Sequence, residues 1–350
     1  MCSMTARVGM MKRLIKNFSH NHEVLIGKRL NKNVFSRSGA LCLTANVILT
    51  EEHLNALYDF GVVIKENDVD SDTEATTRLV DDAVLEVKHI FYHAKHSDQL
   101  FVRQIKHNVV PLIHTLIHKY SLSHLLTALQ CKDDYTFRHS IAVGALATLI
   151  GEWLHVKKDD LEVLTTASIL HDIGKMKIDS EILLSTGPLS NDQFREMKEH
   201  TVLGFDMIQS TPGLGERHAL VALRHHERWD GSGYPYGLNG HCIDFLSRIV
   251  AVADVFHAMS SKRPYKDQLP FYKVIREMYY STFGSFDPNI ILTFTQKIMN
   301  SLIGSKVELS NGQIGKIIRI NPSDLPNPLV QTKGRFIDLS MSPMYIDKIV

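Results

Sequence analysis

The chain is 350 residues long, 44% of it apolar, and its 39 lysines and arginines nearly balance its 38 aspartates and glutamates. This length and composition are typical of a globular chain of two or three domains. The net charge of +1 disfavours a protein that binds nucleic acid or anionic membranes through a broad basic surface. A small phosphorylated ligand, which needs only a few cations, stays compatible with it.

Cysteine usage and hydropathy indicate the compartment. Cys2, Cys42, Cys131 and Cys242 lie far apart and form no C-x-x-C pair, so we expect neither a disulfide framework nor a thiolate zinc site. No apolar run approaches the roughly 18 residues that a membrane-spanning helix needs. The basic stretch near the N-terminus lacks the apolar core and cleavage site of a signal peptide. We therefore expect a cytoplasmic protein without a membrane span.

Residues 1–66 predict a small α/β segment. Its β-prone runs are broken by turn residues, and a short helix is expected to follow Thr50, a suitable N-cap with two glutamates after it. The acidic stretch 66–72 is interpreted as a linker. Ser71 and Glu74 have the spacing of a capping box, which predicts a new helix at this point.

From there to about residue 300, apolar residues recur at helical spacing. We divide this part into a helical linker region, residues 67–120, and a larger helical domain, residues 121–302. Pro111 lies inside a helical run and should kink or divide it.

Residues 303–350 predict a small β appendage. Two β-prone runs flank Asn311-Gly312, a strong hairpin signal, and residues 336–340 predict a further strand. The predicted fold is therefore mainly α, a helical bundle with small β-rich appendages at the N- and C-termini.

Side chains that can bind metals fall at the ends of apolar stripes in the helical part. Leu164 and Ser168 lead at helical spacing to His171, and Met197 leads to His200. A lone histidine on an apolar face is more often a core residue bonded to a backbone carbonyl. Seven histidines and aspartates that face the inside of a helical bundle cost free energy unless they are paired or bind a metal, which favours a metal site. The candidates are His139, His171, Asp172, His200, His225, His226 and Asp254. Six histidines lie outside this pattern, and we interpret them as surface or packing residues: His93, His96, His107, His114, His118 and His124.

Two further segments accompany these candidates. The loop after His226 contains Gly231 and Gly233, which suit an irregular backbone or a close backbone approach. Arg263 and Lys266 follow Asp254 and could hold phosphate. The alternative for this pair is an ordinary solvated helix end with favourable cations. Its position after a candidate ligand favours the phosphate role.

Together these segments resemble the HD-GYP branch of the HD phosphohydrolases over roughly residues 120–300. The residues that carry the resemblance are His139, His171-Asp172-x-Gly174-Lys175, His200, His225-His226-Glu227-x-x-Asp230-Gly231-x-Gly233-Tyr234-Pro235 and Asp254. The resemblance implies an HD-type helical bundle that binds two or three iron or manganese ions. It also implies hydrolysis of cyclic di-GMP to the linear dinucleotide pGpG, or on to GMP, by a hydroxide that bridges the metals.

The resemblance also implies residue roles. The seven candidates would be metal ligands, with Asp172 bridging two ions, and Asp172 and Lys175 would be the catalytic residues. Lys175 would contact the scissile phosphate, and Tyr234, Arg263 and Lys266 would be further substrate contacts. Nitrogen and oxygen ligands without thiolate suit iron or manganese, with zinc as an alternative.

The chain departs from the family pattern at two positions. Members with three metals have a glutamate four residues before the first histidine, where this chain has Tyr135, so we expect two ions. His257 replaces an aspartate that is common three residues after the last ligand, which affects the fine details of the site.

Other functions are weighed beside this one. An HD phosphohydrolase could act on another nucleotide, and a receptor could bind cyclic di-GMP without turnover. Loss of a ligand would mark the receptor, and none is lost. We expect cyclic di-GMP as the partner and no nucleic acid, and we leave open a homodimer.

Overall fold

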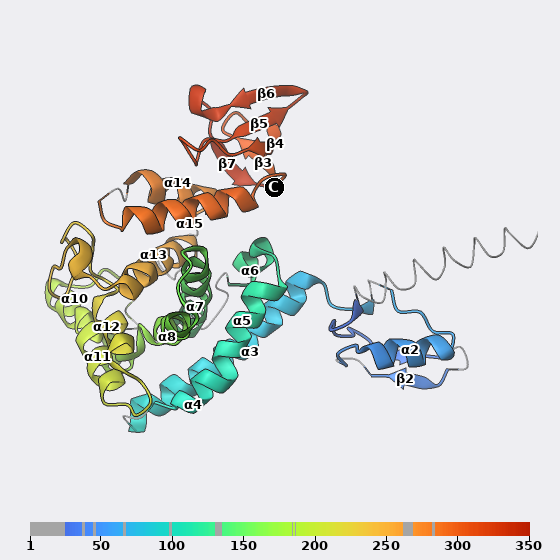
Figure 1. Cartoon of the computed structure of the whole chain (residues 1–350), viewed down its shortest axis with the longest axis horizontal. Helices are drawn as coiled ribbons and strands as arrows, with labels where there is room; N and C mark the ends of the chain where they lie inside the picture. The colour runs from blue at the N-terminus through green and yellow to red at the C-terminus, as the bar shows by residue number, and fades with distance from the viewer. Residues whose placement is uncertain are drawn as a thin grey trace, which may run out of the picture. The chain divides into compact units, whose positions relative to one another are not determined.

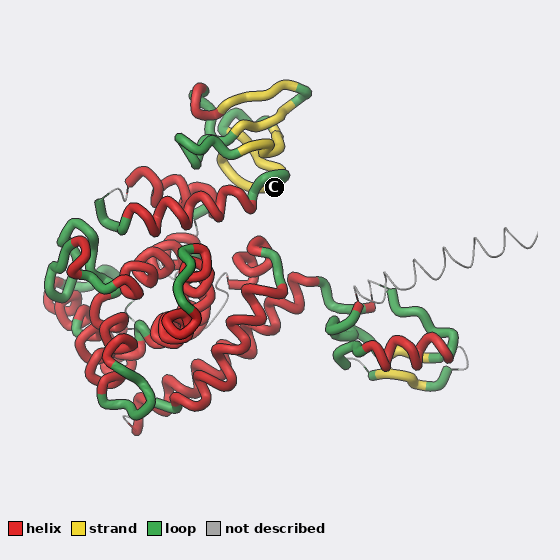
Figure 2. Tube along the Cα trace, in the orientation of Figure 1, coloured by secondary structure: helices red, strands yellow, loops and turns green. Residues whose placement is uncertain are grey.

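The computed structural model describes residues 25–36, 39–44, 47–65, 68–97, 100–129, 135–183, 185, 187–261, 269–281 and 284–350. Contacts divide this chain into two compact units, with the boundary after Arg78. Helices dominate, and strands lie near both ends of the described chain (Figure 2). The predicted mainly α fold with β appendages is therefore confirmed. No helix in the described ranges combines the length and the apolar character needed to cross a membrane.

The first unit contains a small sheet and a short helix. Strands β1 (Val34–Phe35) and β2 (Leu41–Leu43) pair antiparallel, and α2 (Glu51–Asp59) follows them. The Thr50 hydroxyl accepts a hydrogen bond from the backbone N–H of His53 at 3.2 Å, which confirms the predicted cap. The unit has its own apolar core, formed by Leu25, Leu30, Val34, Leu49, Leu54, Leu57, Ile64 and Val69.

The long helix α3 (Asp72–Ser97) begins as the sequence predicts. The backbone N–H of Ser71 donates to the Glu74 carboxylate at 2.9 Å, and the N–H of Glu74 donates to the Ser71 hydroxyl at 3.2 Å. This reciprocal pair satisfies two donors that a helix start would otherwise leave unpaired.

The next helical run is divided ahead of Pro111, as predicted. It comprises α4 (Val102–Gln104), the π-helical turn η2 (Ile105–Val109) and α5 (Val110–Lys119). Proline has no N–H to donate and is tolerated at the start of a helix, so the irregular turn lies directly before it. Helix α6 (Leu122–Leu129) follows.

Helix α7 (Tyr135–Trp153) is the centre of the second unit (Figure 1). It is buried on all sides from Phe137 to Gly151 and contacts α5, α6, α8, α13 and α15. An all-round apolar helix is stable only where neighbours cover every face. The other helical elements of this unit are α8 (Lys158–Leu170), η3 (Ile173–Lys177), α9 (Ser180–Leu183), α10 (Asn191–Lys198), α11 (His200–Gln209), α12 (Glu216–Arg224), η4 (Gly240–Cys242), α13 (Phe245–Ser260), α14 (Phe271–Ser281) and α15 (Pro288–Ser301).

The C-terminal part is a five-stranded antiparallel sheet in the order β6-β5-β4-β3-β7. The predicted hairpin joins β3 (Lys306–Leu309) to β4 (Ile314–Arg319), and the predicted last strand is β6 (Arg335–Asp338), which ends in the short helix η5 (Leu339–Met341). Strands β5 (Leu329–Thr332) and β7 (Ile346–Ile349) were not predicted.

The sheet is fixed to α14 by polar contacts. Lys273 forms an ion pair with Asp347 at 2.8 Å, and the guanidinium of Arg276 lies over the ring of Tyr345.

Candidate metal centre

All seven predicted metal ligands lie together in the second unit. His139 comes from α7, the pair His171–Asp172 from the turn after α8, His200 from the first turn of α11, the pair His225–His226 from the end of α12, and Asp254 from α13. They form two groups, within each of which one donor atom per residue lies within 4.8 Å of the others. The groups are His139, His171 and Asp254, and Asp172, His200, His225 and His226.

Gly174 explains how the turn after α8 reaches α11. A Cβ atom at this position would lie 2.0 Å from the carbonyl oxygen of His200 and 2.5 Å from the backbone nitrogen of Gly204. Only glycine permits this backbone contact between η3 and α11. The contact brings the His171–Asp172 turn against His200, which the sequence places on a different helix.

The carboxylate of Asp172 lies between the two groups of ligands. Its Oδ2 atom is 3.3 Å from Nε2 of His171 and 3.7 Å from Nε2 of His139. Its Oδ1 atom is 3.4 Å from Nε2 of His200 and 3.7 Å from Nε2 of His225. One oxygen therefore faces each group, which is the arrangement that a carboxylate bridging two ions requires.

Backbone carbonyls fix the orientation of three imidazoles. The Nδ1 atoms of His171, His200 and His225 lie 2.7, 2.6 and 2.9 Å from carbonyl oxygens three residues earlier in the chain. A carbonyl can only accept, so each Nδ1 carries a proton, and in the neutral ring Nε2 keeps its lone pair. Those Nε2 atoms face Asp172. Histidines that bind metals commonly have this arrangement, in which a hydrogen-bond partner holds the other ring nitrogen.

Electrostatics keeps most of these imidazoles neutral. Burial lowers the pKa of His139, holds that of His225 and His226 well below its ordinary value, and lowers that of His200 to about 4. His171 differs: burial would lower its pKa, but the nearby carboxylates of Asp172 and Asp254 together outweigh this effect and raise it. Neutral imidazole is the form that binds a metal.

The carboxylates are ionised. Burial alone would raise the pKa of Asp172, but the charges of Lys175 and His171 outweigh it and hold this pKa well below its usual range. Contacts with His139 do the same for Asp254.

Two polar atoms at the centre lack hydrogen-bond partners. Nε2 of His171 and Oδ1 of Asp172 are buried, and neither has a partner among the described residues. Such atoms cost free energy unless something else satisfies them. Metal ions between the two groups would do so, and the nitrogen and oxygen donor set fits them. The clusters can therefore hold metal ions.

Lys175 and Tyr234, two predicted substrate contacts, lie beside the ligands. The Lys175 ammonium is 2.5 Å from Oδ2 of Asp172, and its side chain is 23% exposed. The Tyr234 ring stacks on His226 with centroids 4.6 Å apart, and burial raises the pKa of its hydroxyl. Arg263 and Lys266 lie outside the described residues.

The loop after α12 is held by a residue to which the sequence assigned no role. Glu227 is buried, and its carboxylate accepts hydrogen bonds from the backbone N–H groups of Tyr236 and Leu238 at 2.8 and 2.9 Å. The loop also folds back tightly, because a Cβ on Gly233 would lie 2.4 Å from the backbone nitrogen of Arg228. Glu227 belongs to the family motif, but only the fold reveals that its carboxylate fixes this loop.

The two positions that depart from the family pattern both contact His139. The Tyr135 ring stacks on the His139 ring with centroids 5.5 Å apart and an interplanar angle of 14°. His257 places its Nδ1 atom 2.9 Å from Nδ1 of His139. A phenol ring therefore stands where the three-metal pattern has a carboxylate.

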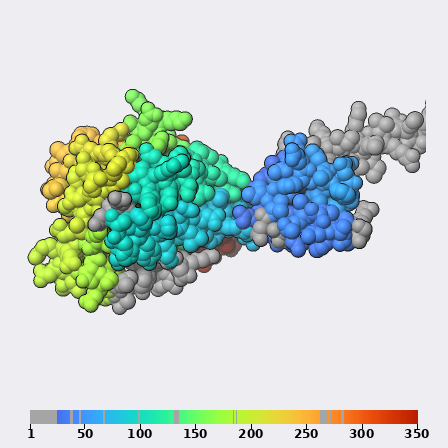
Figure 3. Space-filling model, turned by 90° about the horizontal axis from the view of Figure 1, so that it is seen from below, coloured from blue at the N-terminus to red at the C-terminus, as the bar shows by residue number. Residues whose placement is uncertain are grey.

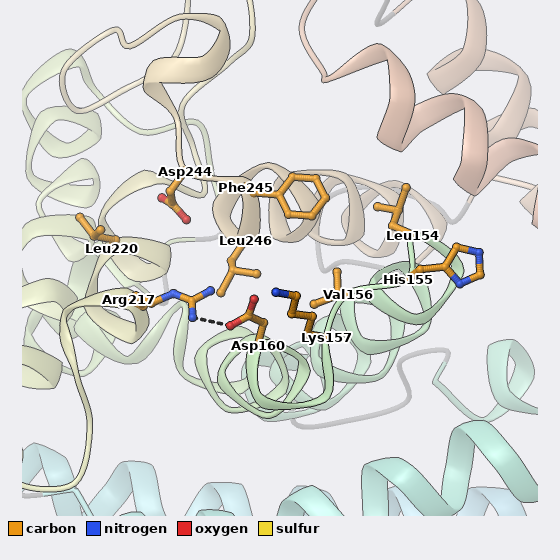
Figure 4. A pocket seen from close by; sticks show the side chains of 10 residues that line it. All are labelled: Leu154, His155, Val156, Lys157, Asp160, Arg217, Leu220, Asp244, Phe245 and Leu246. Atoms are coloured by element: carbon orange, nitrogen blue, oxygen red, sulfur yellow. Dashed lines mark hydrogen bonds and ion pairs between the residues drawn. The ribbon is translucent and has the colours of Figure 1, made fainter.

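A pocket of about 460 Å³ lies elsewhere in the second unit (Figure 4). Three of its polar side chains have structural partners: Arg217 pairs with Asp160 at 2.6 Å, and Asp244 caps α13 by accepting from the N–H of Ser247 at 3.0 Å. None of the seven candidate ligands lines this pocket. Its lining thus forms structural contacts apart from the metal centre.

Comparisons with known proteins agree with this geometry. A cyclic di-GMP phosphodiesterase from Thermotoga maritima is 40% identical over 164 residues, which are 47% of this chain and 45% of that protein. A 3'3'-cGAMP-specific phosphodiesterase of Vibrio cholerae is 33% identical over 171 residues, 49% of this chain and 37% of that protein. The chain spans about half the length, or less, of the curated relatives it matches.

A solved structure shares the fold. Bd1817, an HDG"Y"P protein from Bdellovibrio bacteriovorus, superposes with a TM-score of 0.54 at 14% identity, covering 78% of this chain and 96% of that one. The family model for the HD domain matches residues 121–290, which contain all seven candidate ligands. Residues 121–290 therefore form an HD domain, and the proteins that the chain resembles over this region include ones named cyclic di-GMP phosphodiesterases.

Proposed function

We propose that the chain is a metal-dependent phosphodiesterase that hydrolyses cyclic di-GMP to pGpG or GMP. The observation that carries this proposal is the position of Asp172 between two groups of His and Asp ligands, with one carboxylate oxygen toward each. Paired ions held in this way are typical of phosphodiester hydrolysis. The names of several relatives support cyclic di-GMP as the substrate.

We infer that the centre holds two ions, iron or manganese, with zinc as the alternative. The donors are imidazole nitrogens and carboxylate oxygens, which suit these metals. Tyr135 supports two ions over three, because its stacked ring leaves no carboxylate at that position. When bound, the ions would lower the pKa of a coordinated water and neutralise charge on the phosphoryl group.

Residues of the chain supply the remaining requirements. Lys175 is partly exposed beside Asp172, so its ammonium can stabilise the charge that grows on the phosphate in the transition state. Tyr234 covers His226 and gives the substrate a half-buried aromatic wall. Cyclic di-GMP has a second phosphate that the metals do not hold, and we assign Arg263 and Lys266 to it from the sequence alone.

A second candidate substrate is another cyclic dinucleotide. Three relatives are named as 3'3'-cGAMP-specific phosphodiesterases, at 31–34% identity. A receptor without turnover is less well supported, because all seven candidate ligands are present and converge. Either enzymatic activity would act on a charged messenger that does not cross membranes unaided, so we place the protein in the cytoplasm.

The test is hydrolysis by protein purified without oxygen. Its metal content is measured by elemental analysis, and cyclic di-GMP and 3'3'-cGAMP are compared as substrates by chromatography of the products. We expect about two ions per chain and faster turnover of cyclic di-GMP. Asp172→Ala should lose most of both ions and all measurable hydrolysis. Metal-loaded protein that binds cyclic di-GMP without cleaving it would contradict the proposal, as would full metal content in Asp172→Ala.

A further inference from the structure

A second group of metal-binding side chains lies outside the metal centre, where α5 packs against α7. His114 and His118 are on α5, and Glu152 is in the last turn of α7. Nε2 of His118 is 3.1 Å from Oε1 of Glu152, and the two imidazole rings are nearly parallel, at 5°. One donor atom from each of the three residues lies within 4.8 Å of the other two. The three side chains therefore converge on one point.

The spacing on α5 is that of a helical metal chelate. Residues four apart lie one above the other on the same helix face, so two histidines at this spacing can bind one ion together. Glu152 adds an anionic oxygen from the neighbouring helix. The sequence interpretation of these histidines as surface or packing residues did not consider Glu152, which is close to them only in the fold.

The surroundings of His114 disfavour its protonation but place negative charge near its ring. Burial, and then the neighbouring His118, lower the pKa of His114, so this ring is neutral at pH 7. No hydrogen bond to the His114 ring is found within the described residues, which leaves its lone pair available. The carboxylates of Glu152 and Glu162 are negative charges near His114, and they act to raise its pKa. A divalent ion would meet this negative charge without displacing a hydrogen bond of His114.

An ion can reach the group from solvent. The side chain of His118 is 58% exposed and that of Glu152 is 28% exposed. The segment that contains α3 to α6 forms much of the surface of the second unit seen in Figure 3. Solvent exposure also means that substitution of His118 removes few packing contacts.

We propose that His114, His118 and Glu152 form a separate site for one divalent transition-metal ion of the zinc class. Two imidazoles and a carboxylate bind zinc with a fourth position open to water. The ion ties α5 to the C-terminal end of α7. His139 is 13 residues earlier on the same helix, about 20 Å away at 1.5 Å per residue. This site is therefore distinct from the metal centre.

The test counts zinc in the full-length protein with its active-site metals in place. Wild type, His118→Ala, Glu152→Gln and the control His107→Ala are equilibrated with zinc chloride, desalted and analysed for all metals. His107 is exposed on the adjacent π-helical turn and is not part of the group. The melting temperature of each protein is measured with and without zinc, and circular dichroism checks its folding.

We expect wild type and His107→Ala to retain one more zinc ion per chain than the other two variants. Zinc should raise the melting temperature of only these two proteins, because a ligand that binds the folded state alone stabilises it. Equal extra zinc in all four proteins would place the ion elsewhere and overturn the proposal. If none of the four proteins retains extra zinc, the group is only a contact between histidine and glutamate, and the proposal is overturned. Glu152→Gln keeps the side-chain size, so it decides the matter if His118→Ala does not fold.

Discussion

Nδ1 of His257 lies 2.9 Å from Nδ1 of His139, and Nε2 of His257 lies 3.2 Å from the carbonyl oxygen of Leu129. Because a carbonyl only accepts, His257 carries its proton on Nε2 and accepts at Nδ1 from His139. Nε2 of His139, the other nitrogen of this ring, faces Asp254 at 3.1 Å. His257 thus orients His139 as backbone carbonyls orient His171, His200 and His225.

We predict that His257→Asp keeps both metals and that His257→Leu weakens metal binding. Aspartate can accept from Nδ1 of His139, as in the family pattern, whereas leucine accepts nothing. Loss of such an outer partner typically costs about 10- to 100-fold in metal affinity. Dialysis against a graded chelator, followed by elemental analysis, measures the affinity. The exposed His96, changed to leucine, is the control. A His257→Leu protein that holds its metals as tightly as wild type would disprove the orienting role.

Features of the fold that depend on neighbouring residues could be predicted from the sequence. The helix starts at Thr50 and Ser71 and the hairpin at Asn311-Gly312 each need only a few adjacent residues, and the structure confirms all three. Strand β7 has four residues and pairs with β3, far earlier in the chain, so its β conformation depends on that distant partner and local propensity did not indicate it. Strand β5 also has four residues, but it pairs with β6 across the two-residue turn Lys333-Gly334, a local signal that the sequence analysis did not use.

In the candidate site, too, some features could be predicted from the sequence and others could not. The seven candidate ligands could be named from the sequence because the motif carries them residue by residue, and the structure brings them together. The position of Asp172 between the groups, the contact of His257 with His139 and the burial of Glu227 depend on tertiary packing. No spacing in the sequence reveals which oxygen of a carboxylate faces which helix. For the same reason, the sequence did not reveal that Glu152 lies close to the histidines of α5.

We predict that Gly174→Ala severely destabilises the second unit. The added methyl would overlap the backbone of His200 at 2.0 Å, and backbone cannot rotate away as a side chain can. The loss of unfolding free energy should exceed the ~1–3 kcal/mol usual for overpacking a core. Urea denaturation of the metal-free protein measures it. Gly187→Ala is the matched control, because nothing lies within 4 Å of a Cβ there. A Gly174→Ala protein as stable as this control would refute the close backbone contact.

The metal-free protein should lose stability as the pH falls from about 6.5 to 4. Burial lowers the pKa of His200 from 6.5 to about 4, so in this window the unfolded chain binds a proton that the folded chain does not. Stability rises with increasing pH wherever the unfolded state binds more protons, so it falls as the pH is lowered through this window. His200→Gln removes this titration, and its melting temperature should fall less over the same window. Thermal melts at several pH values test this, and parallel curves for both proteins would exclude His200 as a source of acid sensitivity.

Lys175 should act on turnover without holding the metals. Its ammonium contacts Asp172 at 2.5 Å but is partly exposed, so it can turn to a phosphoryl oxygen when the substrate is bound. Removing one electrostatic donor of this kind typically lowers kcat by about 10²-fold or more. We therefore expect Lys175→Ala to lose kcat by this factor, with metal content and KM for cyclic di-GMP little changed. Lys177→Ala is the matched control, because Lys177 lies on the same short helix η3 but is exposed. If Lys175→Ala instead loses metal, its ammonium serves to balance the charge of Asp172. If it turns over normally, Lys175 has no part in the chemical step.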